Sequence, residues 1–208
     1  MSRDDVSRRS AGAKADYFAF LGLPRRLMVD MPLLEQRFRE LSRRYHPDYF
    51  YNASQRERLE SLEKSSHLND AYRTLRDPAS RIEYLLKLEG LPPVRADHQD
   101  GRGTQAPKVP PSLLEEVFAL NEELDAIREA REARSQDAAA LRARLEAARR
   151  PIEAKREEHE RELRALSARW DADQDRATLE ALRERMLERN YIGNLLATID
   201  REVSAIDG

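Results

Sequence analysis

A tripeptide in the first quarter of the chain could carry chemistry: His46, Pro47 and Asp48 place an imidazole and a carboxylate on either side of a ring-locked residue. Those two groups can form an acid–base pair. We expect Pro47 to hold them on a sharp turn that points their side chains apart. No nearby serine or threonine is arranged as a nucleophile, and the chain has no glycine-rich phosphate loop. An alternative is an all-α hydrolase that uses His46. It predicts that the isolated protein turns over a substrate, and we expect no such activity.

The same residues give little support for a metal site. The histidines stand at positions 46, 67, 98 and 159, so none has a second histidine three or four residues away, and there is no cysteine. We therefore predict that the protein binds no metal ion and no other cofactor. Without a wider context the tripeptide is an ordinary turn, in which proline fixes φ and aspartate caps the next segment.

The composition favours long helices. Of the 208 residues, 40% are apolar but only 6% are aromatic, and 37% are charged. The net charge of −2 gives no overall attraction to nucleic acid or to an anionic membrane, so an electrostatic partner must recognise a local patch. No apolar run is long enough to span a bilayer, and residues 1–15 lack the apolar stretch of a secretory signal. We expect a cytoplasmic protein with no nucleic-acid or membrane partner.

Apolar spacing predicts a helical hairpin in the first half of the chain. One helix face repeats at spacings of four, three and four, at Leu34, Phe38, Leu41 and Tyr45. We expect a short helix or turn over 16–23, a helix from Leu33 to about His46 capped by Asp30, a loop over 48–54, a helix from Ser54 or Gln55 to Leu75, and a short helix over 80–89. The predicted core face of the second long helix is Leu62, Ser65, Asn69, Tyr72 and Leu75. The two long helices then run antiparallel around the tripeptide.

The second half predicts an antiparallel three-helix bundle. Its helices are expected over 112–133, 137–170 and 176–206, with a turn at 171–175. Ser112 and Glu115 have the spacing of a capping box, and Pro151 is expected to kink or divide the middle helix. Residues 91–111 hold five prolines and two glycines, the composition of a linker. The prediction is thus an all-α chain with a disordered arm at 1–15, a hairpin domain at 16–90, a Pro-rich linker at 91–111 and a bundle at 112–208.

The segments DYFAFLGL, RRYHPD and NDAYRTLRDPASRIEYLL resemble, in order and spacing, the J domain of DnaJ-type co-chaperones over about residues 16–89. The matching positions are Tyr17, Leu21, Gly22, Tyr45, His46, Pro47, Asp48, Asn69, Ala71, Tyr72, Leu75, Asp77, Pro78, Arg81 and Tyr84. The resemblance implies that the His-Pro-Asp loop and the basic face of the preceding helix dock on a DnaK-class chaperone ATPase and stimulate its ATP hydrolysis. It also implies that the chain is not itself an enzyme.

The helix before the loop carries a basic face of four side chains, Arg37, Arg39, Arg43 and Arg44. Such a run is usually a solvated helix face, but beside this loop it favours a surface that steers an acidic partner. Asp48 is followed by Tyr-Phe where many relatives have lysine, so we expect a lower charge on this loop.

The rest of the chain resembles one kind of J protein. It has no Gly/Phe-rich segment and no cysteine-rich module, and DYF with LGLP, RIEYLLKL at 81–88 and NEELDAIREA at 121–130 are similar to HscB, the J protein of iron–sulfur cluster assembly. The resemblance implies an HscA- or DnaK-type chaperone as ATPase partner and an IscU-type scaffold protein as client of the bundle. The absence of an N-terminal cysteine module favours a bacterial form.

A client surface is expected on the first bundle helix. The predicted core seam of this helix is Leu113, Val117, Leu120, Leu124 and Ile127, and Leu114 and Phe118 lie about 100° away from it. By resemblance the scaffold-binding residues are Leu114, Glu115, Phe118, Glu122 and Tyr191, with Ala119 and Ala126 where better-known relatives have acidic residues. The alternative function is a J-domain adaptor for an unrelated client or an oligomeric assembly. Any homodimer is expected to be weak.

Overall fold

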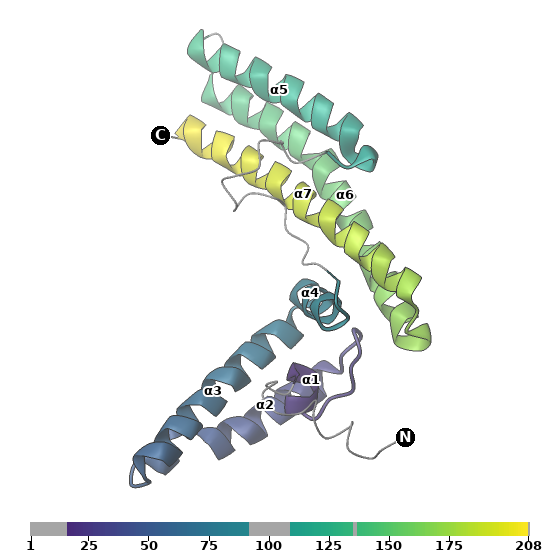
Figure 1. The fold of residues 1–208 in the computed structure, drawn as a ribbon. Coiled ribbons are helices and arrows are strands. Elements are labelled where there is room, and N and C mark those ends of the chain that lie inside the picture. Colours follow the sequence, from purple (N-terminus) through teal and green to yellow (C-terminus); the bar gives the residue numbers. More distant parts are fainter. Residues whose placement is uncertain (1–15, 92–108, 135–136, 208) are drawn as a thin grey trace. The chain divides into compact units, whose positions relative to one another are not determined.

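The structure, a computed structural model, describes residues 16–91, 109–134 and 137–207 (Figure 1). The predicted arm at 1–15 and most of the predicted linker therefore lie outside the described residues. Within those three ranges every regular element is a helix: α1 Tyr17–Phe20, α2 Met31–Tyr45, the 3-10 helix η2 Pro47–Phe50, α3 Gln55–Arg76, α4 Pro78–Leu88, the 3-10 helix η3 Pro111–Leu113, α5 Leu114–Glu132, α6 Ala138–Asp173 and α7 Arg176–Asp207. Contacts divide the chain into two compact units, with the boundary between Leu85 and Leu86 inside α4.

In the first unit, α2 and α3 form an antiparallel hairpin, and α1 packs against α3. Local signals set the ends of both long helices. The carboxylate of Asp30 accepts a hydrogen bond from the Leu33 N–H at 3.1 Å to begin α2, and the extended backbone of His46 before proline ends it. A complete capping box between Ser54 and Glu57 begins α3. The predicted hairpin is confirmed.

The predicted core face of α3 was right at Leu75, which is buried, but wrong at Leu62 and Asn69. Leu62 is 57% exposed and Asn69 is exposed, whereas the buried residues of this helix are Ser61, Leu68, Ala71 and Leu75. A polar side chain takes the core position because the Ser61 hydroxyl donates to the Tyr45 carbonyl at 2.9 Å, which satisfies both groups. This hydrogen bond ties α3 to the last residue of α2, directly before His46.

In the second unit, α6 and α7 form a long antiparallel hairpin, and α5 lies along the half of it that contains the C-terminus (Figure 1). The predicted seam of α5 is buried in a core with residues of both other helices, namely Leu141, Leu145, Ile152, Ile192, Leu196 and Ile199. Trp170 is buried near the other end of the hairpin. The helix continues through the predicted turn to Asp173, and the chain reverses at Gln174 with φ of +49°. The predicted three-helix bundle is confirmed.

The start of α5 differs from the predicted capping box. Residues Pro111–Leu113 form η3, so α5 begins after Ser112, and its N-cap residue Leu113 makes no side-chain cap. The Ser112 hydroxyl instead donates to Glu188 Oε1 of α7 at 2.6 Å. The Ser112 hydroxyl therefore binds a buried carboxylate far away in the sequence and does not form the predicted capping box with Glu115.

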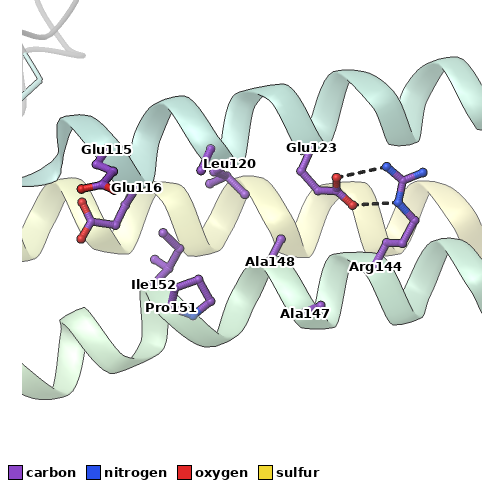
Figure 2. A pocket seen from close by; sticks show the side chains of 10 residues that line it. Glu115, Glu116, Leu120, Glu123, Arg144, Ala147, Ala148, Pro151 and Ile152 are labelled. Atoms are coloured by element: carbon purple, nitrogen blue, oxygen red, sulfur yellow. Dashed lines mark hydrogen bonds and ion pairs between the residues drawn. The ribbon is translucent and has the colours of Figure 1, made fainter.

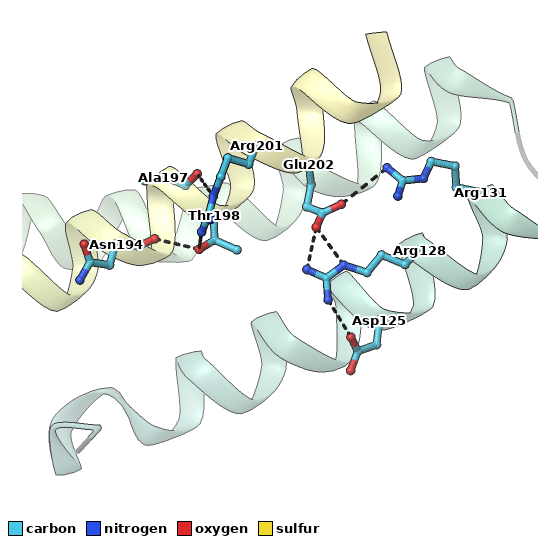
Figure 3. Close-up of polar contacts among 8 residues, drawn as sticks. All are labelled: Asp125, Arg128, Arg131, Asn194, Ala197, Thr198, Arg201 and Glu202. Atoms are coloured by element: carbon cyan, nitrogen blue, oxygen red, sulfur yellow. Dashed lines mark hydrogen bonds and ion pairs between the residues drawn. The ribbon is translucent and has the colours of Figure 1, made fainter. Parts of the chain in front are cut away.

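A charged cluster fixes α5 against α7 at the other end of α5 (Figure 3). Glu202 of α7 accepts two hydrogen bonds from the Arg128 guanidinium, at 2.6 and 2.8 Å, and lies 3.7 Å from Arg131. Asp125 holds Arg128 from the same helix at 3.1 Å. The Glu202 side chain is only 14% exposed, so solvent screens these contacts less than it would on an open surface. The cluster sets the register of α5 on α7.

Pro151 lies inside α6, which is one continuous helix. Replacing Pro151 with alanine is expected to stabilise the protein by about 2 kcal/mol. A helix-interior proline costs about 3 kcal/mol relative to alanine, because it cannot donate to the carbonyl of Ala147, and the freer unfolded chain of the variant takes back up to about 1 kcal/mol. Urea unfolding followed by circular dichroism measures the change. The exposed neighbour Arg150 gives the control Arg150→Ala, expected within about 0.5 kcal/mol of the parent. Equal or lower stability of the proline variant would contradict the expectation.

Candidate functional site

The His-Pro-Asp tripeptide lies between two fixed helix ends. Tyr45, the last residue of α2, is held to α3 by Ser61, and α3 begins at its own capping box. Between them, Pro47–Phe50 forms η2 where the sequence predicted a loop. Its first turn closes when the Tyr49 N–H donates to the His46 carbonyl at 3.1 Å. The tripeptide is therefore a rigid turn rather than an open loop.

The two functional side chains of this turn approach each other, so the expectation that they point apart was wrong. His46 Nδ1 accepts a hydrogen bond from the Asp48 N–H at 3.3 Å and lies 3.5 Å from Asp48 Oδ2. His46 is the N-cap residue of η2, and its side chain turns towards Asp48 because it caps the exposed N–H of that residue. The side chains of His46 and Asp48 are nevertheless 51% and 87% exposed. Such a pair is open to contact by another molecule and does not enclose a substrate.

The structure gives the metal hypothesis no support either. No group of three or more histidine, cysteine, aspartate or glutamate side chains lies in a metal-binding arrangement among residues 16–91, 109–134 and 137–207. In the same ranges, no helix is both long and apolar enough to cross a membrane.

All four arginines of the basic face are exposed on α2, but they differ in their partners. Arg37 pairs with Glu40 at 3.2 Å and Arg39 pairs with Glu35 at 3.8 Å. Within the described part of the chain, neither Arg43 nor Arg44 has an acidic partner; the Arg44 guanidinium lies 5.8 Å from the centre of the Tyr45 ring. The uncompensated positive charge of α2 is thus concentrated in its last turn, next to His46.

A second candidate surface lies on α5, and we call it the α5 surface: Leu114, Glu115, Phe118 and Glu122. All four side chains are exposed, with Leu114 at 41% and Phe118 at 67%, and they face away from the buried seam. Tyr191, the fifth predicted client residue, is not exposed to solvent in the same way. It is half-buried on α7 and packs against the bundle core, and this burial raises the pKa of its hydroxyl. Four of the five predicted client residues therefore share one exposed face, and the fifth is largely covered.

A groove between α5 and α6 borders the α5 surface and encloses about 520 Å³ (Figure 2). Its floor contains Leu120 and Ile152, and Glu115 stands at its edge. Glu123 and Arg144 close one end with two hydrogen bonds, at 2.7 and 3.1 Å. The groove is apolar at its base and has carboxylates at its rim. The α5 surface, which is also apolar and acidic, therefore continues towards α6.

Sequence reasoning missed a buried polar cluster on α6 and α7. Glu188 is 6% exposed, and its Oε2 lies 3.4 Å from His159 Nδ1 while it also accepts a hydrogen bond from Arg185. Burial alone would lower the pKa of Arg185, but its hydrogen bond and ion pair with Glu188 raise it. The available signal was His159 at core spacing between Ile152 and Leu163. Through Ser112, this cluster also anchors the chain directly before the α5 surface.

Comparison with known proteins finds relatives of one kind. Residues 16–84 match the DnaJ domain family. The chain is 40% identical over 112 residues to a co-chaperone protein HscB homolog of Aliivibrio fischeri, and 42% identical over 112 residues to one of Vibrio vulnificus. Each match covers 54% of this chain and 61% of the relative, so the chain spans about three fifths of the length of the curated relatives it matches.

Two solved structures are similar over most of the chain. Chaperone HscB from Vibrio cholerae aligns with a TM-score of 0.63 and 28% identity, covering 92% of this chain and 99% of that one. Human co-chaperone protein HscB aligns with a TM-score of 0.61 and 28% identity, covering 90% and 81%. The resemblance and the all-α architecture predicted from the sequence are confirmed.

Proposed function

Because residues 16–84 match the DnaJ domain and the chain resembles HscB co-chaperones in sequence and fold, we propose that it is a co-chaperone of iron–sulfur cluster assembly. In this role it binds an IscU-type scaffold protein, brings it to an HscA- or DnaK-type chaperone and stimulates that partner's ATP hydrolysis. The protein itself performs no chemistry. The observation that carries the proposal is the rigid, exposed turn that presents His46 and Asp48 beside the positive charge of Arg43 and Arg44. A cytoplasmic location stays a prediction.

The geometry of the first unit suits the triggering step. Arg43 and Arg44 supply the long-range attraction that raises the rate of encounter with an acidic ATPase surface. The turn Pro47–Phe50 is already ordered, so little conformational freedom is lost when His46 and Asp48 are bound. The residues that attract the ATPase and the residues that trigger its ATP hydrolysis are therefore adjacent, at one end of the α2–α3 hairpin.

The geometry of the second unit suits client binding. Leu114 and Phe118 are exposed apolar side chains on a helix whose other face is fully buried, and the carboxylates of Glu115 and Glu122 flank them. An apolar centre with a polar rim is the usual anatomy of a specific interface. The half-buried position of Tyr191 predicts that it contributes less contact area than Phe118.

The test of the function is a reconstituted ATPase assay. Addition of the chain to a DnaK-class chaperone is expected to raise steady-state ATP hydrolysis, and an IscU-type scaffold is expected to raise it further. Stimulation without any effect or binding of the scaffold would favour the alternative, an adaptor for an unrelated client. No stimulation of any DnaK-class partner would overturn the proposal.

Replacing Leu114 and Phe118 with serine is expected to weaken scaffold binding at least tenfold, because buried apolar anchors typically carry about 1–2 kcal/mol each. Both side chains are exposed in the free protein, so the fold is expected to stay intact. Isothermal titration calorimetry measures the affinity. Leu59 and Leu62 of α3, each 57% exposed, give the matched control Leu59→Ser with Leu62→Ser, expected to bind the scaffold as the parent does. Unchanged affinity of the α5 double variant would refute the client surface.

A further inference from the structure

Two aromatic rings beside the His-Pro-Asp turn stand open to solvent. Tyr49 is 75% exposed and Tyr51 is 80% exposed, more than Leu114 or Phe118 of the α5 surface, and Phe50 between them is half-buried. We call Tyr49 and Tyr51 the aromatic pair. Each ring has a large apolar area that folding has not removed from water. Large exposed apolar groups next to one another mark surfaces that other proteins cover.

The backbone under the aromatic pair is ordered by successive short-range hydrogen bonds. The Tyr49 N–H donates to the His46 carbonyl at 3.1 Å, the Tyr51 N–H to the Asp48 carbonyl at 3.4 Å and the Ala53 N–H to the Phe50 carbonyl at 3.0 Å. The rings thus project from a fixed support. A tyrosine held in this way loses little freedom when a partner buries it, which is why tyrosine is frequent among the strongest interface contacts.

The first ring of the aromatic pair, Tyr49, lies beside His46, the residue proposed to trigger ATP hydrolysis. The Tyr49 ring lies edge-on to the His46 ring, with centroids 6.1 Å apart and an interplanar angle of 75°. The His46 side chain is itself half open to solvent. A protein surface that covers the exposed part of His46 must therefore also contact Tyr49. The protein that covers Tyr49 is consequently the one that covers the turn, and Tyr51 is joined to the same turn through its backbone N–H, which donates to the Asp48 carbonyl.

We propose that Tyr49 and Tyr51 form an apolar arm of the docking surface for the chaperone ATPase, an inference that rests on the proposed function. The partner's matching surface is apolar with hydrogen-bond acceptors placed for the two phenolic hydroxyl groups. Affinity from such contacts is insensitive to salt, because it comes from buried ring area, whereas the contribution of Arg43 and Arg44 is screened. The docking surface thus combines a salt-dependent part on α2 with a salt-independent part after Asp48.

The proposal is tested by titrating the full chain into its DnaK-class chaperone at low and at high salt and measuring ATP hydrolysis. Tyr49→Ala with Tyr51→Ala is expected to raise the concentration for half-maximal stimulation at least tenfold at both salt concentrations, with nearly full stimulation at saturation. Tyr49→Phe with Tyr51→Phe, which keeps the rings, should recover most of that loss. Arg43→Ala with Arg44→Ala should raise the same concentration chiefly at low salt. Leu59→Ala with Leu62→Ala is the control for exposed apolar residues and should match the parent.

The possible outcomes separate this proposal from the proposed function. If the parent chain does not stimulate the chaperone, the proposed function fails and this proposal fails with it. If the parent stimulates and the alanine pair stimulates at the same concentrations, the proposal alone is overturned. A lower maximum with an unchanged half-maximal concentration would mean that Tyr49 acts through the position of His46, which also overturns it. Loss of self-association with unchanged stimulation would assign the rings to a contact with a second copy of the chain, and the docking proposal would again be overturned.

Discussion

Replacing His46 with glutamine is expected to reduce the ATPase activity of a DnaK-class chaperone to its unstimulated rate, with little change in the stability of the variant. The imidazole is half exposed at the start of η2, and the hydrogen bond that it accepts from the Asp48 N–H is exposed to water. Breaking an exposed contact of this kind costs about 0.5 kcal/mol or less. The loss of function therefore has to come from the lost contact with the partner and not from unfolding.

The measurement is steady-state ATP hydrolysis by the chaperone at saturating concentrations of the variant, beside thermal unfolding of the same protein. His98→Gln, in the predicted linker, is the matched control and should stimulate fully. Stimulation by the His46 variant at the parent level would contradict the assignment of this turn. A large drop in melting temperature would instead show that His46 is a structural residue.

Replacing Arg81 with methionine is expected to destabilise the first unit by about 3 kcal/mol or more, because each buried carbonyl left unpaired costs about 1–3 kcal/mol. The Arg81 side chain is buried at 5% exposure, and its guanidinium donates to the backbone carbonyls of Leu75 at 2.7 Å, Arg76 at 3.2 Å and Leu27. These carbonyls lie in the segment before α2 and at the end of α3, so one side chain joins two distant parts of the unit. Methionine fills much of the same volume but cannot donate to them.

Chemical denaturation followed by circular dichroism measures this effect, and two further variants define it. Arg81→Lys is expected to recover little, because one ammonium group cannot reproduce the planar fork of donors. Arg73 is a surface arginine of α3 whose side chain is 77% exposed and paired with Asp70, so Arg73→Met should cost no more than about 1 kcal/mol. A cost below about 1 kcal/mol for Arg81→Met would show that water replaces the guanidinium at these carbonyls.

The sequence predicted those features that depend on neighbouring residues. Asp30, Pro47 and Ser54 begin or end helices through groups within a few residues of themselves, so the bounds of α2 and α3 agree with the structure. The seam of α5 was also predicted, because its apolar residues keep one helical spacing throughout. Local chemistry and periodicity were sufficient for the hairpin and for the bundle.

Features that depend on distant partners could not be predicted in this way. Ser61 occupies a core position because of a carbonyl in another helix, and Ser112 leaves its local cap because of Glu188, 76 residues away. The exposure of the α5 surface and the covering of Tyr191 likewise depend on how three helices pack. Each case required knowledge of which groups meet in space. The approach of His46 to Asp48 is a local contact, but it was also missed, because the prediction of a simple proline turn did not include the cap that the His46 side chain makes on η2.

Trp170, buried at 3% exposure near the end of the α6–α7 hairpin that lies away from the C-terminus, is the chain's one tryptophan. Selective excitation of intrinsic fluorescence therefore reads a single place in the molecule. Its emission is expected to follow the opening or closing of this hairpin end and not local changes around Phe118, which lies on α5 along the other half of the hairpin. The native chain thus contains its own optical probe, without any label, for whether a client bound at the α5 surface loosens the far end of the same bundle.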